Sequence, residues 1–140
     1  MINISKLYCG LAGESDDLRY RREKSFGPIV VYNCTRRCNL RCLHCYSSSE
    51  SNQFSDELTT ARAKQLLSEL ADVNCPVVLF SGGEPLLRDD LFELLAEARR
   101  LGLRTVISSN GTLLDSGTAG QLAGAGVSYV GISIDGDEQF

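Results

Sequence analysis

The sequence offers little that would suggest a membrane or a secreted protein. No apolar run approaches the roughly 20 residues that a membrane-spanning helix needs. The start, MINISKLYCGLAGESDD, lacks a basic flank followed by a continuous apolar stretch, so we expect no secretory signal. There is no low-complexity tract, and a net charge of −4 argues against a nucleic-acid partner. For a chain of 140 residues, these absences predict one cytoplasmic domain with a single hydrophobic core.

Histidine is scarce, with one residue, whereas cysteine is abundant, with six. Four of the cysteines lie within twelve positions of the segment CTRRCNLRCLHCYSSS: Cys34, Cys38, Cys42 and Cys45. His44 lies among them. In a reducing compartment, such close spacing favours a metal site or a redox function over a disulfide framework.

The spacing leaves two metal sites open. The inner three cysteines, C-x3-C-x2-C, can act as thiolates on one cluster, and soft sulfur ligands suit iron–sulfur or zinc far better than calcium or magnesium. With Cys34 they would form a tetrathiolate, closed as structural zinc sites are closed. Zinc ribbons usually use two C-x2-C pairs, however, and that spacing occurs here only once. Cys34 also lies at the end of an apolar run, where it would be a buried packing residue.

Four apolar, β-branched runs alternate with helical patterns, which predicts an α/β fold. The third helical pattern is weakened by Gly117, Gly120 and Gly124, each of which costs about 1 kcal/mol relative to alanine. Near-continuous apolar strands with helices of 10–15 residues between them predict right-handed βαβ units around a parallel sheet. The expected strands are 28–33, 76–81, 104–109 and 127–134, and the expected helices are 58–73, 89–102 and 113–126.

Polar or glycine-rich clusters follow each of the four strands: CTRRCNLRCLHC, SGGEP, SSNGT and DGDEQ. In a parallel sheet or barrel, the carboxyl ends of the strands lie on one side, and that side carries the site. We therefore expect the four clusters to converge on one edge of the sheet.

The chain stops directly after the fourth strand, with no helix to cover that strand. Four strands cannot close a barrel, and parallel sheets need covered faces or closure. We therefore expect the N-terminal part of a longer protein, whose unpaired fourth strand would favour self-association.

The SGGEP segment indicates which kind of small molecule a cluster held by the cysteines could bind. Three thiolates on a cubane of four irons leave one iron without a protein ligand, free to bind a small molecule, whereas four thiolates would only store or pass an electron. Gly82 and Gly83 expose main-chain N–H and C=O groups, with the Glu84 carboxylate beside them. That combination suits an ammonium group on a short polar chain.

These motifs resemble those of the radical S-adenosylmethionine (SAM) enzymes. CNLRCLHCY is similar to their cluster motif, C-x3-C-x-(aromatic)-C, with His44 in the aromatic position. SGGEP resembles the glycine-rich motif that meets the amino group of SAM, and SSNGTLLD and VGISIDG resemble the next two strand ends. The resemblance covers residues 28–137 in the family's order. It implies the first four strands of a (β/α)6 radical SAM barrel in residues 28–140, after an N-terminal extension in residues 1–27.

Three cysteines, Cys34, Cys9 and Cys75, match no part of the motif and are expected to be buried or free thiols. The resemblance implies a role for ten other residues. The implied ligands are Cys38, Cys42 and Cys45 for a [4Fe–4S] cluster; Gly82, Gly83 and Glu84 for the SAM amino group; Ser109 and Ser133 for its carboxylate or ribose, with Asn110 in the same cofactor-binding turn; and His44 against the adenine.

The implied activity is the reductive cleavage of SAM to methionine and a 5′-deoxyadenosyl radical, which abstracts hydrogen from a small-molecule substrate. The electron would come from a donor such as flavodoxin or ferredoxin. The rival hypothesis is a non-catalytic four-cysteine module that binds zinc or an iron–sulfur cluster. Such a module would have no need of the polar residues after the other three strands.

A narrower resemblance concerns the substrate. ISKLYCG, followed by GPIVVYNCTRRCNLRCLHCYSSS, is similar to radical SAM proteins of the alternative haem and haem d1 pathways. That branch implies a sirohaem-derived tetrapyrrole whose carboxylate-bearing side chains are removed or oxidised. Peptide-modifying radical SAM enzymes share much of the motif set and are the alternative.

Overall fold

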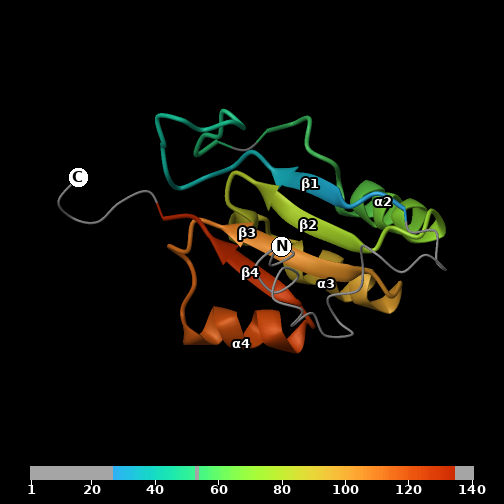
Figure 1. Ribbon diagram of the computed structural model, residues 1–140. Helices are drawn as coiled ribbons and strands as arrows, with labels where there is room; N and C mark the ends of the chain where they lie inside the picture. Colours follow the sequence, from blue (N-terminus) through green and yellow to red (C-terminus); the bar gives the residue numbers. More distant parts are fainter. Residues whose placement is uncertain (1–26, 53, 135–140) are drawn as a thin grey trace, which may run out of the picture.

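The chain folds as a four-stranded, wholly parallel sheet with a helix between successive strands (Figure 1). The computed structural model describes residues 27–52 and 54–134, so Cys9 and nearly all of the expected N-terminal extension lie outside the described residues. The strands lie side by side in chain order, which is the arrangement expected of successive βαβ units. They are β1 (Val30–Thr35), β2 (Val77–Gly82), β3 (Arg104–Ser109) and β4 (Tyr129–Ile132).

The helices connect these strands and follow the expected pattern with shorter ends. Helix α2 (Thr60–Asp72) begins after Thr59, whose side chain accepts a hydrogen bond from the Arg62 N–H, as an N-cap does. A 3-10 turn, η2 (Pro85–Leu87), precedes helix α3 (Leu91–Arg100). Helix α4 (Ser116–Gly124) begins later than expected, because the Asp115 carboxylate caps it by accepting from the Thr118 N–H.

Strand β3 has its expected bounds, and β2 starts and ends one residue later than expected. Strand β1 continues through Cys34 and Thr35, two residues beyond the expected end. Thr35 pairs with Gly82 of β2, and Cys34 lies at the bulge between Asn33 and Thr35. Cys34 therefore belongs to the sheet and not to the loop that follows it.

One face of the sheet carries the hydrophobic core. Tyr32, Phe80 and Ile107 are register partners on adjacent strands, and the Tyr32 and Phe80 rings meet edge to face at 5.7 Å. Leu67 of α2 and Leu94 of α3 are fully buried in the same core. Each leucine buried in this way stabilises the fold by roughly 2 kcal/mol. The helices expected at 58–73 and 89–102 thus form and pack on the sheet.

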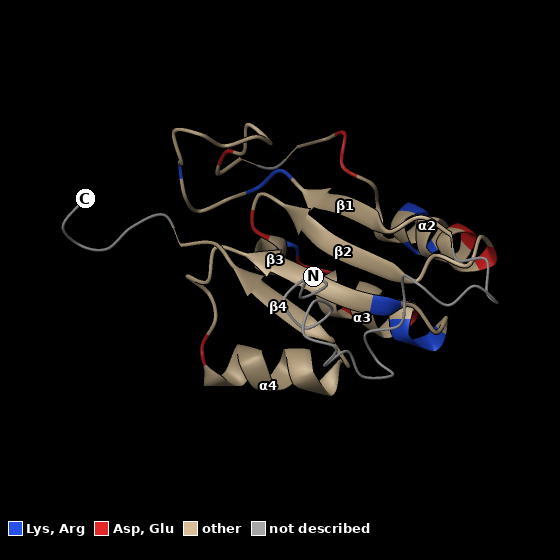
Figure 2. Ribbon diagram, viewed as in Figure 1, with Lys and Arg blue, Asp and Glu red and all other residues tan. Residues whose placement is uncertain are grey.

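No helix of the described residues covers the opposite face of the sheet (Figure 1). Because side chains alternate along a strand, the neighbours of the core residues form a second row: Val31, Leu79, Val106 and Tyr129, which pair in register. Val31 is 56% exposed and Tyr129 is 49% exposed. Figure 2 shows strands without charged residues, apart from Arg104 at the start of β3. A neutral, partly apolar surface therefore lies beside the carboxyl ends of the strands.

No helix within residues 27–52 and 54–134 combines the length and the apolar character needed to span a bilayer.

Candidate metal centre at the strand ends

The cysteine segment is a closed loop that leaves the sheet at the end of β1. Its two ends are joined by main-chain hydrogen bonds, from Cys38 N–H to Glu50 O at 2.8 Å and from Glu50 N–H to Arg36 O at 3.2 Å. A main-chain bridge between Arg37 and Glu50 completes this base. The three cysteines expected as ligands therefore lie on one loop whose ends are joined, and Figure 1 shows this loop leaving the sheet beyond the end of β1.

Two of the three sulfurs accept hydrogen bonds from the protein. Cys38 Sγ accepts from the Leu40 N–H at 3.4 Å and from Asn110 Nδ2 at 3.7 Å. Cys45 Sγ lies 3.4 Å from Ser47 Oγ and accepts from the Ser49 N–H at 3.5 Å. These bonds, that of Ser47 first, lower the pKa of the Cys45 thiol to about 6, so the thiolate that metals require is favoured at neutral pH.

The third cysteine, Cys42, is exposed and lines a cavity of about 550 Å³ inside the loop together with Cys45. Among the described residues, no three histidine, cysteine or carboxylate side chains gather around a point where they could hold a single ion. A [4Fe–4S] cluster does not require that, because each thiolate binds a different iron. Three thiols on one loop, of which those of Cys42 and Cys45 border a polar cavity, therefore fit a cluster.

Cys34 is separate from the other three cysteines. It is 1% exposed in the hydrophobic core, and burial raises the pKa of its thiol to about 12. A thiol that stays protonated in the core is a packing residue, so the packing role expected for Cys34 is confirmed. Cys75 is buried as well, with its thiol directed to Val77 O at 3.3 Å.

The two glycines after β2 pack main chain against main chain on the base of the cysteine loop. Gly82 has a φ of +128°, which disfavours any other residue. A Cβ on Gly83 would lie 2.8 Å from Arg36 O and nearer still to Arg37 O. The Gly83 N–H instead donates to Thr35 O at 2.7 Å. The SGGEP segment therefore needs both glycines for this close approach.

Glu84 connects this turn to the end of β3. It is 0% exposed, and its carboxylate accepts from the Ser109 hydroxyl at 3.0 and 3.1 Å and from the Asn110 N–H at 2.7 Å. The Leu86 N–H donates a further bond at 3.1 Å. No cationic side chain of the described residues pairs with this buried charge. Hydrogen bonds alone stabilise it, and a nearby positive ligand would be attracted to it.

The remaining expected residues lie at the edge of this group. His44 lies in an exposed turn of the cysteine loop, between Cys42 and Cys45. Ser133 lies exposed just beyond β4, and its N–H donates to Ser109 O at 3.0 Å. The segments after β1, β2 and β3 thus meet at one edge, as predicted, whereas the DGDEQ cluster expected after the fourth strand lies outside the described residues.

Sequence reasoning missed the side chains that fasten the far end of the loop. The Tyr46 hydroxyl lies 3.1 Å from Asn33 Oδ1 and 3.1 Å from Ser81 Oγ, on paired positions of β1 and β2. The Ser47 hydroxyl reaches Gly82 O at 3.2 Å. The polar run YSSS directly after the last cysteine is the signal that could have indicated these contacts.

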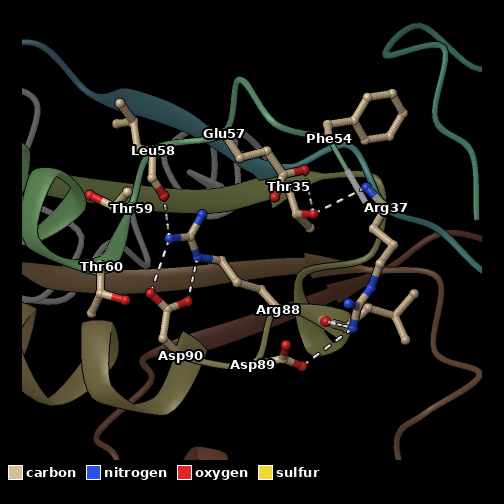
Figure 3. Close-up of a pocket in the computed structure, with 11 residues that line it drawn as sticks. Thr35, Arg37, Phe54, Glu57, Leu58, Thr59, Thr60, Arg88, Asp89 and Asp90 are labelled. Atoms are coloured by element: carbon tan, nitrogen blue, oxygen red, sulfur yellow. Dashed lines mark hydrogen bonds and ion pairs between the residues drawn. The ribbon is translucent and has the colours of Figure 1, made fainter. Parts of the chain in front are cut away.

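A second cavity, of about 300 Å³, lies behind the base of the loop (Figure 3). Arg88 crosses it and donates to Asp90 at 2.6 Å, to Leu58 O at 2.8 Å and to Cys34 O. One guanidinium thereby joins the starts of α2 and α3 to the end of β1. Its pairing is charge-assisted and partly buried, which makes it stronger than a surface ion pair.

Glu57 holds the first turn of the cysteine loop from the same side (Figure 3). Its Oε1 accepts from Thr35 Oγ1 at 2.8 Å and from the Arg36 N–H at 2.7 Å. The Arg37 N–H in turn donates to Thr35 Oγ1 at 3.0 Å. These long-range contacts carry no local sequence pattern, and neither Glu57 nor Arg88 was expected at the site.

Comparison with known protein families identifies one match. The family described as the radical SAM superfamily matches residues 32–140. Among curated proteins, the chain is 51% identical over 148 residues to Fe-coproporphyrin III synthase of Methanosarcina barkeri, covering 97% of this chain and 37% of that protein. It is 49% identical over 109 residues to pre-heme d1 synthase of Dinoroseobacter shibae, covering 78% of this chain and 27% of that protein.

PqqA peptide cyclase of Bradyrhizobium diazoefficiens is 41% identical over 118 residues, covering 83% of this chain and 31% of the cyclase. Among solved structures, BtrN in complex with AdoMet and 2-DOIA superposes with a TM-score of 0.66 at 24% identity, covering 81% of this chain and 48% of BtrN. AdoMet-bound anSMEcpe superposes with a TM-score of 0.62 at 23% identity, covering 79% and 32%. The chain therefore spans well under half the length of these curated relatives.

Proposed function

The chain belongs to the radical SAM superfamily, and from this membership we propose that it provides the SAM-binding and cluster-binding part of an enzyme. The observation that carries the proposal is the anchoring of the Cys38–Cys45 loop over the ends of β2 and β3, with Cys34 excluded from it. When bound, a [4Fe–4S] cluster supplies the electron that cleaves SAM to methionine and a 5′-deoxyadenosyl radical, which abstracts hydrogen from the substrate.

Cys38, Cys42 and Cys45 are the proposed cluster ligands. Cys38 accepts a hydrogen bond from Asn110 just beyond β3, and Cys45 accepts one from Ser49 of the loop. Exposed Cys42 borders a cavity together with Cys45. Three thiolates leave one iron open for SAM, whereas a tetrathiolate with Cys34 would require a protonated core residue to leave the sheet.

The turn after β2 is the proposed site of the SAM amino group. Gly82 and Gly83 keep side chains away from this edge, and the buried negative charge of Glu84 attracts an ammonium group placed there. Ser109, Asn110 and Ser133, at the ends of β3 and β4, are proposed to line the carboxylate and ribose region. His44 is proposed to lie against the adenine, since it is on the same loop as the ligands.

The substrate we propose is a sirohaem-derived tetrapyrrole. The support comes from the relatives at 51% and 49% identity, both of which are named for haem-type products. The neutral face of the sheet opposite the core, with the Val31–Tyr129 row, offers apolar area for a macrocycle. A peptide is the second candidate, favoured by the relative named PqqA peptide cyclase.

The partner we propose is a protein electron donor such as flavodoxin or ferredoxin, with neither nucleic acid nor membrane involved. The net charge of −4 disfavours nucleic acid. A cytoplasmic location suits the chain, because thiolate ligands must remain reduced.

The test is a pair of cysteine variants in anaerobically reconstituted protein. We expect about four irons per chain in the wild type and in Cys34→Ala, and loss of iron in Cys42→Ala. The electron paramagnetic resonance (EPR) spectrum of the dithionite-reduced wild type should change when SAM is added. Equal iron loss in both variants, or zinc in place of iron, would refute the three-thiolate site.

A further inference from the structure

Three polar side chains close a hydrogen-bonded ring between the cysteine loop and the end of β3. Asn110 Nδ2 donates to Asn39 Oδ1 at 2.9 Å, and Asn39 Nδ2 donates to Thr112 Oγ1 at 2.7 Å. Thr112 Oγ1 then donates to Asn110 Oδ1 at 2.7 Å. Residues more than 70 positions apart in sequence are thereby joined directly beside Cys38.

The ring fixes which way the Asn110 amide points. Its Oδ1 accepts two bonds, from the Thr112 hydroxyl at 2.7 Å and from the Thr112 N–H at 3.0 Å. A flipped amide would place two donors against each other at this position. The NH₂ group must therefore face the cysteine loop, where one hydrogen goes to Asn39 and the other to Cys38 Sγ at 3.7 Å.

The main chain of Asn110 is held from below as firmly as its side chain. Its N–H donates to the Glu84 carboxylate at 2.7 Å, and Glu84 is fully buried. The Gly111 N–H donates to Ser109 Oγ at 3.0 Å, which tightens the same turn. The side-chain amide that meets Cys38 thus extends from a main chain that is itself held by hydrogen bonds at the end of β3.

We propose that Asn110 is a positioning residue for Cys38: held by Asn39 and Thr112, its amide donates a hydrogen bond to the first thiolate ligand of the cluster. The inference rests on the proposed function. It assigns Asn110 a task distinct from contact with SAM.

This hydrogen bond acts on electron uptake. A donor to a ligand sulfur stabilises the additional negative charge of the reduced cluster and so raises its reduction potential. A hydrogen bond to a charged group contributes enough to change an equilibrium about tenfold. For one electron, a tenfold change corresponds to about 59 mV. Cys45 has hydrogen bonds of its own, with Ser47 and Ser49 of the loop, so Asn110 acts on the cluster through Cys38.

The experiment compares Asn110→Ala with Thr112→Val in the reconstituted full chain without SAM. The midpoint potential of the cluster is measured by redox titration followed by EPR. Asn110→Ala should lower the potential by about 59 mV, the shift for a tenfold loss. Thr112→Val opens the ring but keeps the Thr112 N–H bond to Asn110 Oδ1, so its potential should stay close to that of the wild type.

An unchanged potential in Asn110→Ala, or the same shift in both variants, would overturn the inference. Failure of the wild type to assemble a cluster would overturn the proposed function instead. If Asn110→Ala does not retain iron, hydrogen exchange of the metal-free protein gives the second readout. The peptide around Leu40, whose N–H donates to Cys38 Sγ, should then exchange faster while peptides of β2 are unchanged. Unchanged exchange around Leu40 would count against the inference.

Discussion

Replacement of Gly83 by alanine tests whether the glycine turn and the cysteine loop form one unit. The new Cβ would lie 2.8 Å from both Arg36 O and the Arg37 carbonyl carbon, and nearer still to Arg37 O. All of these atoms are main chain, so no side chain can rotate away. The turn and the loop base must separate, which disrupts the hydrogen bonds from Gly83 N–H to Thr35 O and from Glu84 N–H to Arg37 O.

Two main-chain hydrogen bonds contribute about 1 kcal/mol each, and overpacking adds strain of similar size. We therefore expect Gly83→Ala to lower the free energy of unfolding by about 2 to 4 kcal/mol. Gly120→Ala is the matched control, since its Cβ would meet nothing within 4 Å inside α4. It should stabilise the chain by about 1 kcal/mol, the difference in helix propensity.

Urea unfolding followed by circular dichroism measures both variants. A loss below about 0.5 kcal/mol in Gly83→Ala, the size of an ordinary surface change, would refute the close packing described for this turn.

Two further changes probe the surroundings of the loop. Burial raises the pKa of the Asp90 carboxyl, but hydrogen bonds from Arg88 and Thr60 outweigh it and hold that pKa below its usual 3.8. The stability that this carboxylate contributes is therefore complete above pH 3.8 and lost as the pH falls through the lowered value. In urea unfolding at pH 6 and pH 3, the wild type should lose more stability than Asp90→Asn, and parallel losses would contradict the pairing. Tyr46→Phe removes the hydroxyl that meets Asn33 and Ser81, so exchange of the Ser47 and Ser49 amides should quicken. Because the Tyr46 side chain is exposed, the free energy of unfolding should fall by less than about 1 kcal/mol, and unchanged exchange would remove its anchoring role.

The order of strands and helices could be predicted because each element carries a local pattern. Thr59 caps α2 as an N-cap threonine should, and both helices bury leucines against the sheet, Leu67 in α2 and Leu94 in α3. The end of β1 could not be predicted in the same way. The packing role of Cys34 was expected, but its place inside the strand was not, because β1 continues past a bulge at Cys34 to pair Thr35 with β2.

The same distinction, between local patterns and contacts made by the fold, applies to the residues of the candidate site. Short motifs indicated the three loop cysteines and the two glycines, since spacing and missing side chains are visible in sequence. Contacts that join distant segments were not visible, as with Glu57 at Thr35 and Arg88 at Cys34 O. Such side chains have no periodicity, and only the fold brings them to the loop.

Glu84 shows why motifs on separate strands must occur together. Its carboxylate binds the turn after β2 through Leu86 and the end of β3 through Ser109 and Asn110. Through the Asn110 amide the same connection reaches Cys38. Parallel strands bring these ends to one edge of the sheet. A single buried carboxylate can therefore set the positions of the glycine turn, the end of β3 and Cys38 together. A change at any one of the three should then be felt at the other two, because they share the hydrogen bonds of one carboxylate.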